Sequence, residues 1–327
     1  MRRRNGACSC GSGERFKNCC GSYKDGPDPH AAISDHDLLE ALKRADDDGL
    51  TAGESPSARS IMNIGRALTT FGIGSFVLMG SNAPTIVTRA KRLNDSLFVP
   101  QALLGGAMHT GAYLFRDMFC QVYAPIAFGT TKIDIWQMVD LTDIQKQWLA
   151  SSETDLACLF DQATDVLDFG YGWQEFGHQS NLDTRGNDLI WRAHAQLEAA
   201  ATTATNGSSC HGTIQSSLLG TELALKAGLA ALGTRNNELK DIGHNLKLAA
   251  KNLGKLKQGF DVDRVCRTLE KFPNFVDSRY NLPTPSSTET GHILMGAQYI
   301  ASEVTRRFSE RDLRRGNQEA PSRLYPA

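Results

Sequence analysis

Residues 153–169, ETDLACLFDQATDVLDF, hold the clearest fold signal in this 327-residue chain. Their apolar side chains recur at three- and four-residue intervals, which places them on one side of an α-helix. These side chains are Leu156, Leu159, Phe160, Ala163, Val166 and Leu167. Ser152 stands directly before the segment, where its hydroxyl can accept a hydrogen bond from a free amide of the first helical turn. The segment therefore predicts an amphipathic helix with one buried face.

The same spacing recurs on both sides of this segment. Before it, helices are predicted at residues 35–45, 57–71, 85–97, 101–123 and 133–149. After it, helices are predicted at residues 188–203, 212–232, 244–256, 262–272 and 289–311. Strand-like alternation between turn signals is confined to a short piece at residues 76–79. The predicted fold class is therefore all-α, with two packed helical bundles.

The eight cysteines are distributed unevenly. Four of them, Cys8, Cys10, Cys19 and Cys20, fall within the first 20 residues, and the others stand singly. Zinc prefers four thiolate or imidazole ligands in a tetrahedron, and two close thiolate pairs joined by a tight loop provide them. Disulfides are the alternative, but the adjacent Cys19 and Cys20 strain such pairing. We expect a small zinc knuckle that binds one Zn²⁺ ion through these four cysteines and folds around it.

Residues 8–21, CSCGSGERFKNCCG, closely resemble the SEC-C motif, the zinc knuckle known from the preprotein translocase motor. The cysteine pairs, the Gly-Ser-Gly turn, the aromatic residue, the lysine and the trailing glycine all coincide. Ser9 departs from the motif, which often has proline there, and the knuckle is amino-terminal in this chain. In the translocase the knuckle docks a chaperone. The resemblance therefore implies a basic module that binds a protein partner, without implying secretion.

Two breaks in the helical pattern predict the domain organisation. Residues 24–29, KDGPDP, favour an extended hinge, and the glycine-rich stretch at 169–177 predicts a second boundary. The predicted parts are a zinc knuckle at 1–24, a linker at 25–34, a helical domain of no recognised family at 35–180, a helical bundle at 186–311 and a flexible tail at 312–327.

Three segments of the second bundle carry polar residues in helical surroundings. Glu222 and Lys226 are one helical turn apart, His244 begins a later helix, and Arg279 and Tyr280 end a connection. Periodicity alone favours the plainer interpretation of a solvated ion pair, a helix start and a core aromatic residue.

In this order and spacing, the same segments resemble the HEPN family, whose members show a Glu-Leu-x-x-Lys helix, a His-x-Leu helix start and an Arg-Tyr before a final helix. The resemblance implies a helical bundle that often dimerises, and a ribonuclease, a nucleotide-binding protein or a scaffold. HEPN nucleases use an arginine and a histidine separated by four to six residues, and no arginine precedes a histidine at that spacing here. What carries over is Glu222, Lys226, His244, Arg279 and Tyr280, as a cluster for a phosphate-bearing ligand or as scaffold.

The middle of the chain offers one more polar group. His109 and Arg116 lie seven residues apart, so they are expected to share a helical face, with Asp117 beside it. A buried Arg–Asp pair is more often a tie between helices than a catalytic pair. The sequence contains no phosphate-binding loop, nucleophile elbow or paired-histidine metalloprotease motif.

Charge and hydropathy predict a cytoplasmic protein. The first 30 residues carry six basic and three acidic side chains, and residues 31–180 carry ten basic and eighteen acidic ones. This distribution does not favour a long basic surface for duplex nucleic acid. Arg2–Arg4 are followed by polar residues instead of an apolar signal core, and the apolar stretch 97–129 carries too many polar residues and glycines for a membrane helix.

Together these features predict a zinc-binding adaptor or regulatory protein. The knuckle would dock a protein partner, and the helical body would form a homodimer. The alternative is a HEPN-like ribonuclease directed at RNA, or a nucleotide-binding protein of a defence or stress system, with an atypical active site. Enzymatic activity is the less favoured interpretation, because the nuclease pair is missing.

Overall fold

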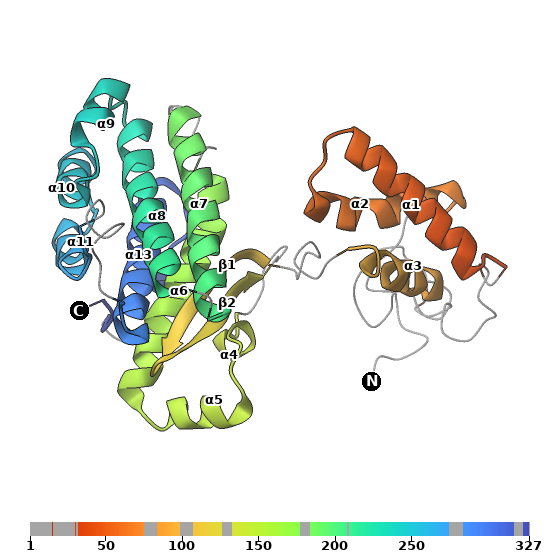
Figure 1. Cartoon of the computed structure of the whole chain (residues 1–327), viewed down its shortest axis with the longest axis horizontal. Coiled ribbons are helices and arrows are strands. Elements are labelled where there is room, and N and C mark those ends of the chain that lie inside the picture. Colours follow the sequence, from red (N-terminus) through yellow and green to blue (C-terminus); the bar gives the residue numbers. More distant parts are fainter. Residues whose placement is uncertain are drawn as a thin grey trace. The chain divides into compact units, whose positions relative to one another are not determined.

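The computed structural model describes most of the chain in two compact units. The described residues are 15, 30, 32–74, 84–98, 107–125, 133–176, 184–207, 209–274, 284–316 and 323–326. Contacts divide the chain into Met1–Gly105 and Gly106–Ala327. Within the described residues α-helices predominate and the strands form one two-stranded sheet, which confirms the predicted helical fold class (Figure 1). The strand-like piece predicted at 76–79 lies outside the described residues.

The described residues of the first unit form three helices, α1 (Asp35–Thr51), α2 (Pro56–Thr70) and α3 (Thr85–Asp95). Ser34 caps α1 by accepting from the amide of Asp37 at 3.1 Å, and Ser55 caps α2. Leu38 and Leu42 of α1, Leu68 of α2 and Ile86 of α3 are fully buried in one cluster. The apolar faces of the three helices therefore form one core.

Four long helices form the centre of the second unit. They are α6 (Glu153–Glu175), α7 (Thr184–Thr205), α8 (Cys210–Ala231) and α13 (Ser287–Phe308). Helix α7 packs on α8, α8 on α13 and α13 on α6, and Figure 1 shows them running side by side. The shorter helices are α4 (Ile135–Met138), α5 (Asp143–Ala150), α9 (Asn236–Ile242), α10 (Leu246–Leu256), α11 (Val262–Leu269) and α14 (Leu313–Gly316). The helix predicted at 133–149 is thus divided into α4 and α5, and α9 was not predicted.

A β-hairpin stands where the sequence predicts a helix at 101–123. Strand β1 (Ala107–Phe115) pairs antiparallel with β2 (Met118–Pro125) through a turn at Arg116 and Asp117, with Phe115 opposite Met118. Arg116 has φ of 61°, which a helix does not permit. The prediction failed because residues 111–115 are buried on both faces of the strand, so their apolar run lacks the alternation of a half-exposed strand.

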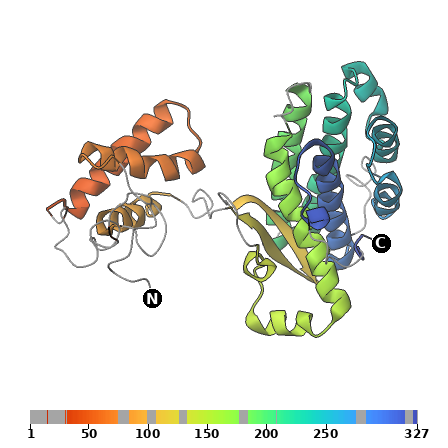
Figure 2. The ribbon, with the colours of Figure 1, turned by 180° about the vertical axis from the view of Figure 1, so that it is seen from behind.

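The hairpin is held by helix side chains along one edge of β1. Strand β1 lies against α6, α7 and α13, and Figures 1 and 2 show the hairpin against these helices. Gln298 of α13 accepts from the amide of Ala112 at 2.8 Å and donates to the carbonyl of the same residue at 2.8 Å. Glu198 of α7 accepts from the amide of Thr110 at 3.1 Å. Helix side chains therefore satisfy the strand edge that has no neighbouring strand.

Residues 169–175 of the glycine-rich stretch predicted as a domain boundary lie inside α6. A Cβ added at Gly170 would meet the Cβ of Ala124 at 2.6 Å, and one at Gly172 would meet the Cβ of Thr305 at 2.9 Å. These glycines let the hairpin and α13 approach α6 closely, instead of breaking the helix. The structure accordingly divides the predicted domain 35–180, because α1–α3 belong to the first unit and the hairpin and α4–α6 to the second.

Part of the tail predicted as flexible is bound to α6. Asp161 accepts from the amides of Leu324 and Tyr325 at 2.7 and 2.9 Å, and Asp168 accepts from the amide of Leu313 at 2.9 Å. Among the described residues, no helix is both long enough and apolar enough to cross a membrane.

Candidate functional site

Three of the five residues predicted to form a polar cluster, Glu222, Lys226 and His244, are in contact in the structure. The ammonium of Lys226 lies 2.7 Å from Oε1 of Glu222 on the same face of α8. Nδ1 of His244 lies 2.8 Å from Oε2 of the same carboxylate. The Glu222 side chain is 8% exposed, that of Lys226 15% and that of His244 50%. One buried carboxylate thus binds two nitrogen groups.

The turn between α9 and α10 positions His244. Gly243 ends α9 with φ of 57°, a conformation that glycine adopts without strain, and Asn245 caps α10 by accepting from the amide of Leu248 at 3.0 Å. His244 is held between these two signals and faces α8. The bond to Glu222 therefore joins the α9–α10 turn to the centre of the second unit.

The remaining predicted site residues lie outside the described residues. These are Arg279, Tyr280 and the four zinc ligands Cys8, Cys10, Cys19 and Cys20. In the described part of the cluster, both oxygens of Glu222 are engaged within the chain. Chemically this arrangement neutralises a buried charge and ties two elements together.

A larger ionic network joins α6 to α13 and the C-terminal segment. Its acidic members are Asp161, Asp165 and Asp168, and its basic members are Arg306, Arg314 and Arg323. Arg306 donates to Asp165 at 2.6 Å and to Asp168 at 2.7 Å. Because acidic and basic groups alternate in direct contact, this network ties α6 to α13 and to the C-terminal segment.

Two carboxyl groups of this network differ in their pKa values. Burial would raise the pKa of Asp165, but two guanidinium groups outweigh it and lower the pKa below its ordinary value. Burial raises the pKa of Asp168 to about 6, because Arg306 and the amide of Leu313 offset it only in part.

A second histidine–carboxylate cluster lies between β1 and α7. Nδ1 of His109 is 3.7 Å from Oε1 of Glu198, and Nε2 of His194 is 3.6 Å from the same oxygen. One ligand atom from each of the three residues lies within 4.8 Å of the other two. His109 is completely buried, the His194 side chain is 12% exposed and the Glu198 side chain 38%. The cluster thus extends from the interior to the surface.

Aromatic rings from α6 surround the two imidazoles. The ring of Trp173 stacks on His194 with centroids 4.3 Å apart, and Phe169 meets His109 edge-on at 5.0 Å. Burial lowers the pKa of His194, and the neighbouring His109 lowers it further. Burial alone would raise the pKa of Glu198, but the two imidazoles and a backbone amide outweigh it and hold the pKa below its ordinary value. His194 is therefore neutral and Glu198 charged at neutral pH.

The sequence contained a partial signal for this cluster. His194 and Glu198 are four residues apart on a predicted helix, a spacing that places both on one face. His109 was singled out, but with Arg116 and Asp117. In the hairpin those two residues form the turn, at the opposite end of β1 from His109, and the Arg116 guanidinium lies 4.5 Å from the centre of the Trp148 ring. The 85-residue separation of His109 from His194 hid their contact.

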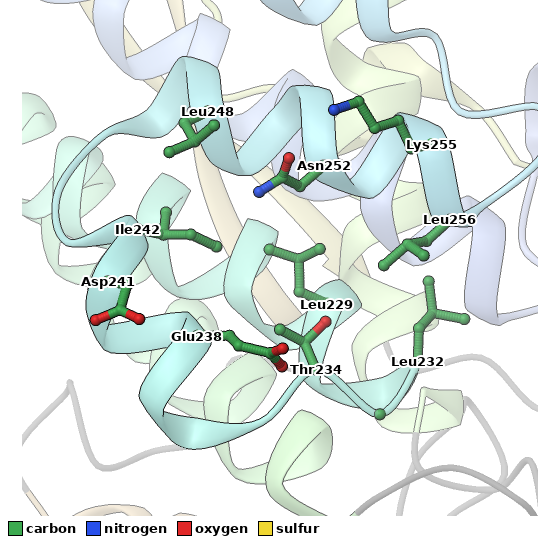
Figure 3. Close-up of a pocket in the computed structure, with 11 residues that line it drawn as sticks. Leu229, Leu232, Thr234, Glu238, Asp241, Ile242, Leu248, Asn252, Lys255 and Leu256 are labelled. Carbon is green, nitrogen blue, oxygen red and sulfur yellow. The ribbon is translucent and has the colours of Figure 1, made fainter.

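A groove of about 620 Å³ lies between the end of α8 and helices α9 and α10. Figure 3 shows its leucine side chains, with Glu238 and Asp241 on α9 and Lys255 on α10. The charged groups stand at the edges of an apolar surface, so this groove resembles a contact surface more than a reaction site.

Comparison with protein-family models, with curated proteins and with solved structures finds no match for this chain.

Proposed function

We propose that this protein is a zinc-binding adaptor or regulatory protein of the cytoplasm. Its N-terminal knuckle docks a protein partner, and its helical body forms a homodimer that presents the knuckles. The observation that carries the proposal is the bonding of Glu222 to both Lys226 and His244, which gives the HEPN-like cluster a structural role. A scaffold needs such ties, whereas a nuclease needs groups that hold phosphate and exchange protons.

The surroundings of His244 support a scaffold. Its Nδ1 bonds to a buried carboxylate, and the guanidinium of Arg235, at the start of α9, bonds to Glu238 at 2.9 Å. Eight residues separate Arg235 from His244, which is two more than the nuclease spacing of four to six allows. The contacts of His244 and Arg235 and the absence of the nuclease spacing therefore both favour a scaffold.

The described cysteines support the assignment of zinc to the knuckle. Burial raises the pKa of the Cys120 thiol to about 12 and raises those of Cys158 and Cys266. Zinc binds thiolates, so these groups are poor ligands near neutral pH. They and Cys210 are free thiols in the structure. Cys8, Cys10, Cys19 and Cys20 are the other four cysteines of the sequence.

One observation favours a nucleotide-binding function as the second candidate. His244, Asn245 and Lys247 border a cavity of about 560 Å³ at the start of α10. Amides of a helix start, an imidazole and an ammonium suit a phosphate group. Calorimetry with a panel of nucleotides tests this candidate, and His244→Ala must then weaken binding. Cleavage of RNA that disappears in His244→Ala would support the ribonuclease instead.

The adaptor proposal is tested by comparing two double variants of the full chain. Cys19→Ser with Cys20→Ser disables the knuckle, and Cys158→Ser with Cys266→Ser is the matched control. We expect the first variant to lose one zinc ion per chain and at least one protein partner, as measured by metal analysis and by quantitative mass spectrometry of co-purified proteins. The control must keep both. Unchanged partners in the knuckle variant would refute the docking role.

A further inference from the structure

The cluster between β1 and α7 has the composition of a metal site. We propose that His109, His194 and Glu198 bind one zinc ion, at a site separate from the N-terminal knuckle. Two imidazoles and one carboxylate are a donor set that zinc accepts. The two units of the chain place this site in Gly106–Ala327, and the knuckle in Met1–Gly105. Neither site supplies a ligand to the other in this assignment.

The distances between donor atoms suit a tetrahedral ion. Two ligands held about 2.1 Å from a tetrahedral zinc lie about 3.4 Å apart. The observed separations from Oε1 of Glu198 are 3.7 Å to Nδ1 of His109 and 3.6 Å to Nε2 of His194. Each imidazole therefore lies within a few tenths of an ångström of the separation from the carboxylate oxygen that a shared ion needs, and the two imidazole donors lie within 4.8 Å of each other.

The hydrogen bonding of the imidazoles independently indicates a missing ligand. Among the described residues, neither ring nitrogen of the fully buried His109 has a hydrogen-bond partner, and Nε2 of His194 has none. An unsatisfied buried polar group costs about 1–3 kcal/mol. An ion between the rings satisfies one nitrogen of each, which accounts for two of these three atoms.

Neighbouring backbone groups hold two of the donors in place. His194 bonds to the backbone of Met108, and because Nε2 has no partner, that bond falls to Nδ1. The protonated nitrogen therefore points to the backbone and leaves a lone pair on Nε2. Glu198 accepts from the amide of Thr110 at 3.1 Å, which uses one of about four lone-pair positions on the carboxylate. Both donors are oriented before an ion arrives.

Electrostatics also favour a cation here. Glu198 supplies an anionic ligand, and the imidazoles of His109 and His194 each have a ring nitrogen that can coordinate an ion. A divalent ion bound to one carboxylate and two imidazoles leaves one net positive charge. This charge lies next to the partly exposed Glu198 side chain, where solvent can reach it. Three protein ligands fill three tetrahedral positions, so the fourth is available to water or to an external donor.

The test uses the full chain with Cys19→Ser and Cys20→Ser, so that zinc in the knuckle does not contribute. We expect one zinc ion per chain in competition with a chromophoric chelator, and no binding of Mg²⁺ or Ca²⁺. His194→Gln in this background must weaken zinc binding more than about 100-fold, because even changes to groups behind the ligands cost about 10–100-fold. His36→Gln, on an exposed histidine of α1, is the matched control and must bind as before.

Cobalt substitution keeps the proposal testable if a variant folds poorly. Co²⁺ in the knuckle-disabled chain must give visible d–d absorption without a thiolate charge-transfer band. Glu198→Gln keeps an acceptor for Thr110 and removes the charge, so it must lose the cobalt spectrum while its circular dichroism stays helical. Absence of bound metal in the knuckle-disabled chain, or an ion that persists in both variants, would overturn the proposal and leave the knuckle assignment untouched. Equal zinc content in the wild-type and the knuckle-disabled chains would contradict the knuckle assignment and leave this proposal intact.

Discussion

Two histidine–carboxylate clusters of the second unit contain similar groups in opposite states. Around Glu222, both carboxylate oxygens are bonded within the chain, one to an ammonium and one to an imidazole. Around Glu198, two imidazoles approach one oxygen to within 3.6–3.7 Å, and three of their nitrogens lack partners among the described residues. The first cluster is complete in the protein alone, and the second is complete only with a further ligand.

The difference shows that residue type does not decide the role of such a cluster. A carboxylate with a nearby cation satisfies its charge internally and contributes to stability. A carboxylate beside two imidazoles whose nitrogens lack partners provides lone pairs that a cation can bind together. The sequence motif drew attention to Glu222, whereas the unsatisfied hydrogen-bonding groups point to Glu198.

The largest expected effect tests whether the Glu222 cluster is structural. Glu222→Gln removes the negative charge and leaves the nearly buried Lys226 without a counter-ion. Breaking a buried pair in this way costs about 3–5 kcal/mol, measurable as a lower free energy of unfolding in urea. Glu238→Gln breaks an exposed pair with Arg235 and should change stability by less than about 1 kcal/mol. Equal effects of both variants would refute the structural role.

The ionic network between α6 and α13 contains a carboxyl group, Asp168, whose contribution to stability depends on pH. Burial raises the pKa of Asp168 to about 6, above its ordinary value of 3.8. The folded state therefore binds this proton more tightly than the unfolded state does, so its contribution is present below pH 4 and is lost as the pH rises to about 6. The shift of two units corresponds to about 3 kcal/mol.

Asp168→Asn should remove this decline. The measurement is the difference in free energy of unfolding between wild type and variant at pH 4 and pH 6.5. Asp155→Asn, an exposed position of the same helix, is the control and should leave the pH profile unchanged. A wild-type stability that rises relative to Asp168→Asn over this interval contradicts the prediction.

Zinc binding by the cluster around Glu198 should raise the stability of the folded chain. Zinc that binds the folded state alone stabilises it by about 2.7 kcal/mol at a concentration 100 times the dissociation constant. In the knuckle-disabled chain, zinc should therefore raise the melting temperature. The rise should vanish in His194→Gln and persist in His36→Gln.

The smallest effect compares the two histidines in metal-free protein. His109→Leu removes two buried nitrogens that lack partners, and this gain offsets the lost ring contact with Phe169, so stability should fall by less than about 1 kcal/mol. His244→Leu removes a bond to a charged group and should cost about 1.5 kcal/mol. Urea unfolding with a chelator present measures both. A larger loss for His109→Leu than for His244→Leu would mean that His109 already has a partner in the protein.

Local sequence signals predicted most of the helices and failed at the hairpin. Helix α6 was predicted from its apolar spacing and its cap at Ser152, because both signals come from residues close in the chain. Strand β1 was predicted as helix, because burial on both faces removes the alternation that identifies a strand. The glycines at 170 and 172 suggested a break, since the hairpin and α13 that pack against them are distant in sequence.

The sequence by itself determined the helical class, the cysteine pattern and the pairing of Glu222 with Lys226. Each of these depends on side chains within one or two helical turns of each other, or on composition. The tertiary structure decided which histidines meet a carboxylate, where the chain divides into units, and which polar atoms remain without partners. Those features require contacts such as His109 with His194, which are 85 positions apart and are made only when β1 packs on α7.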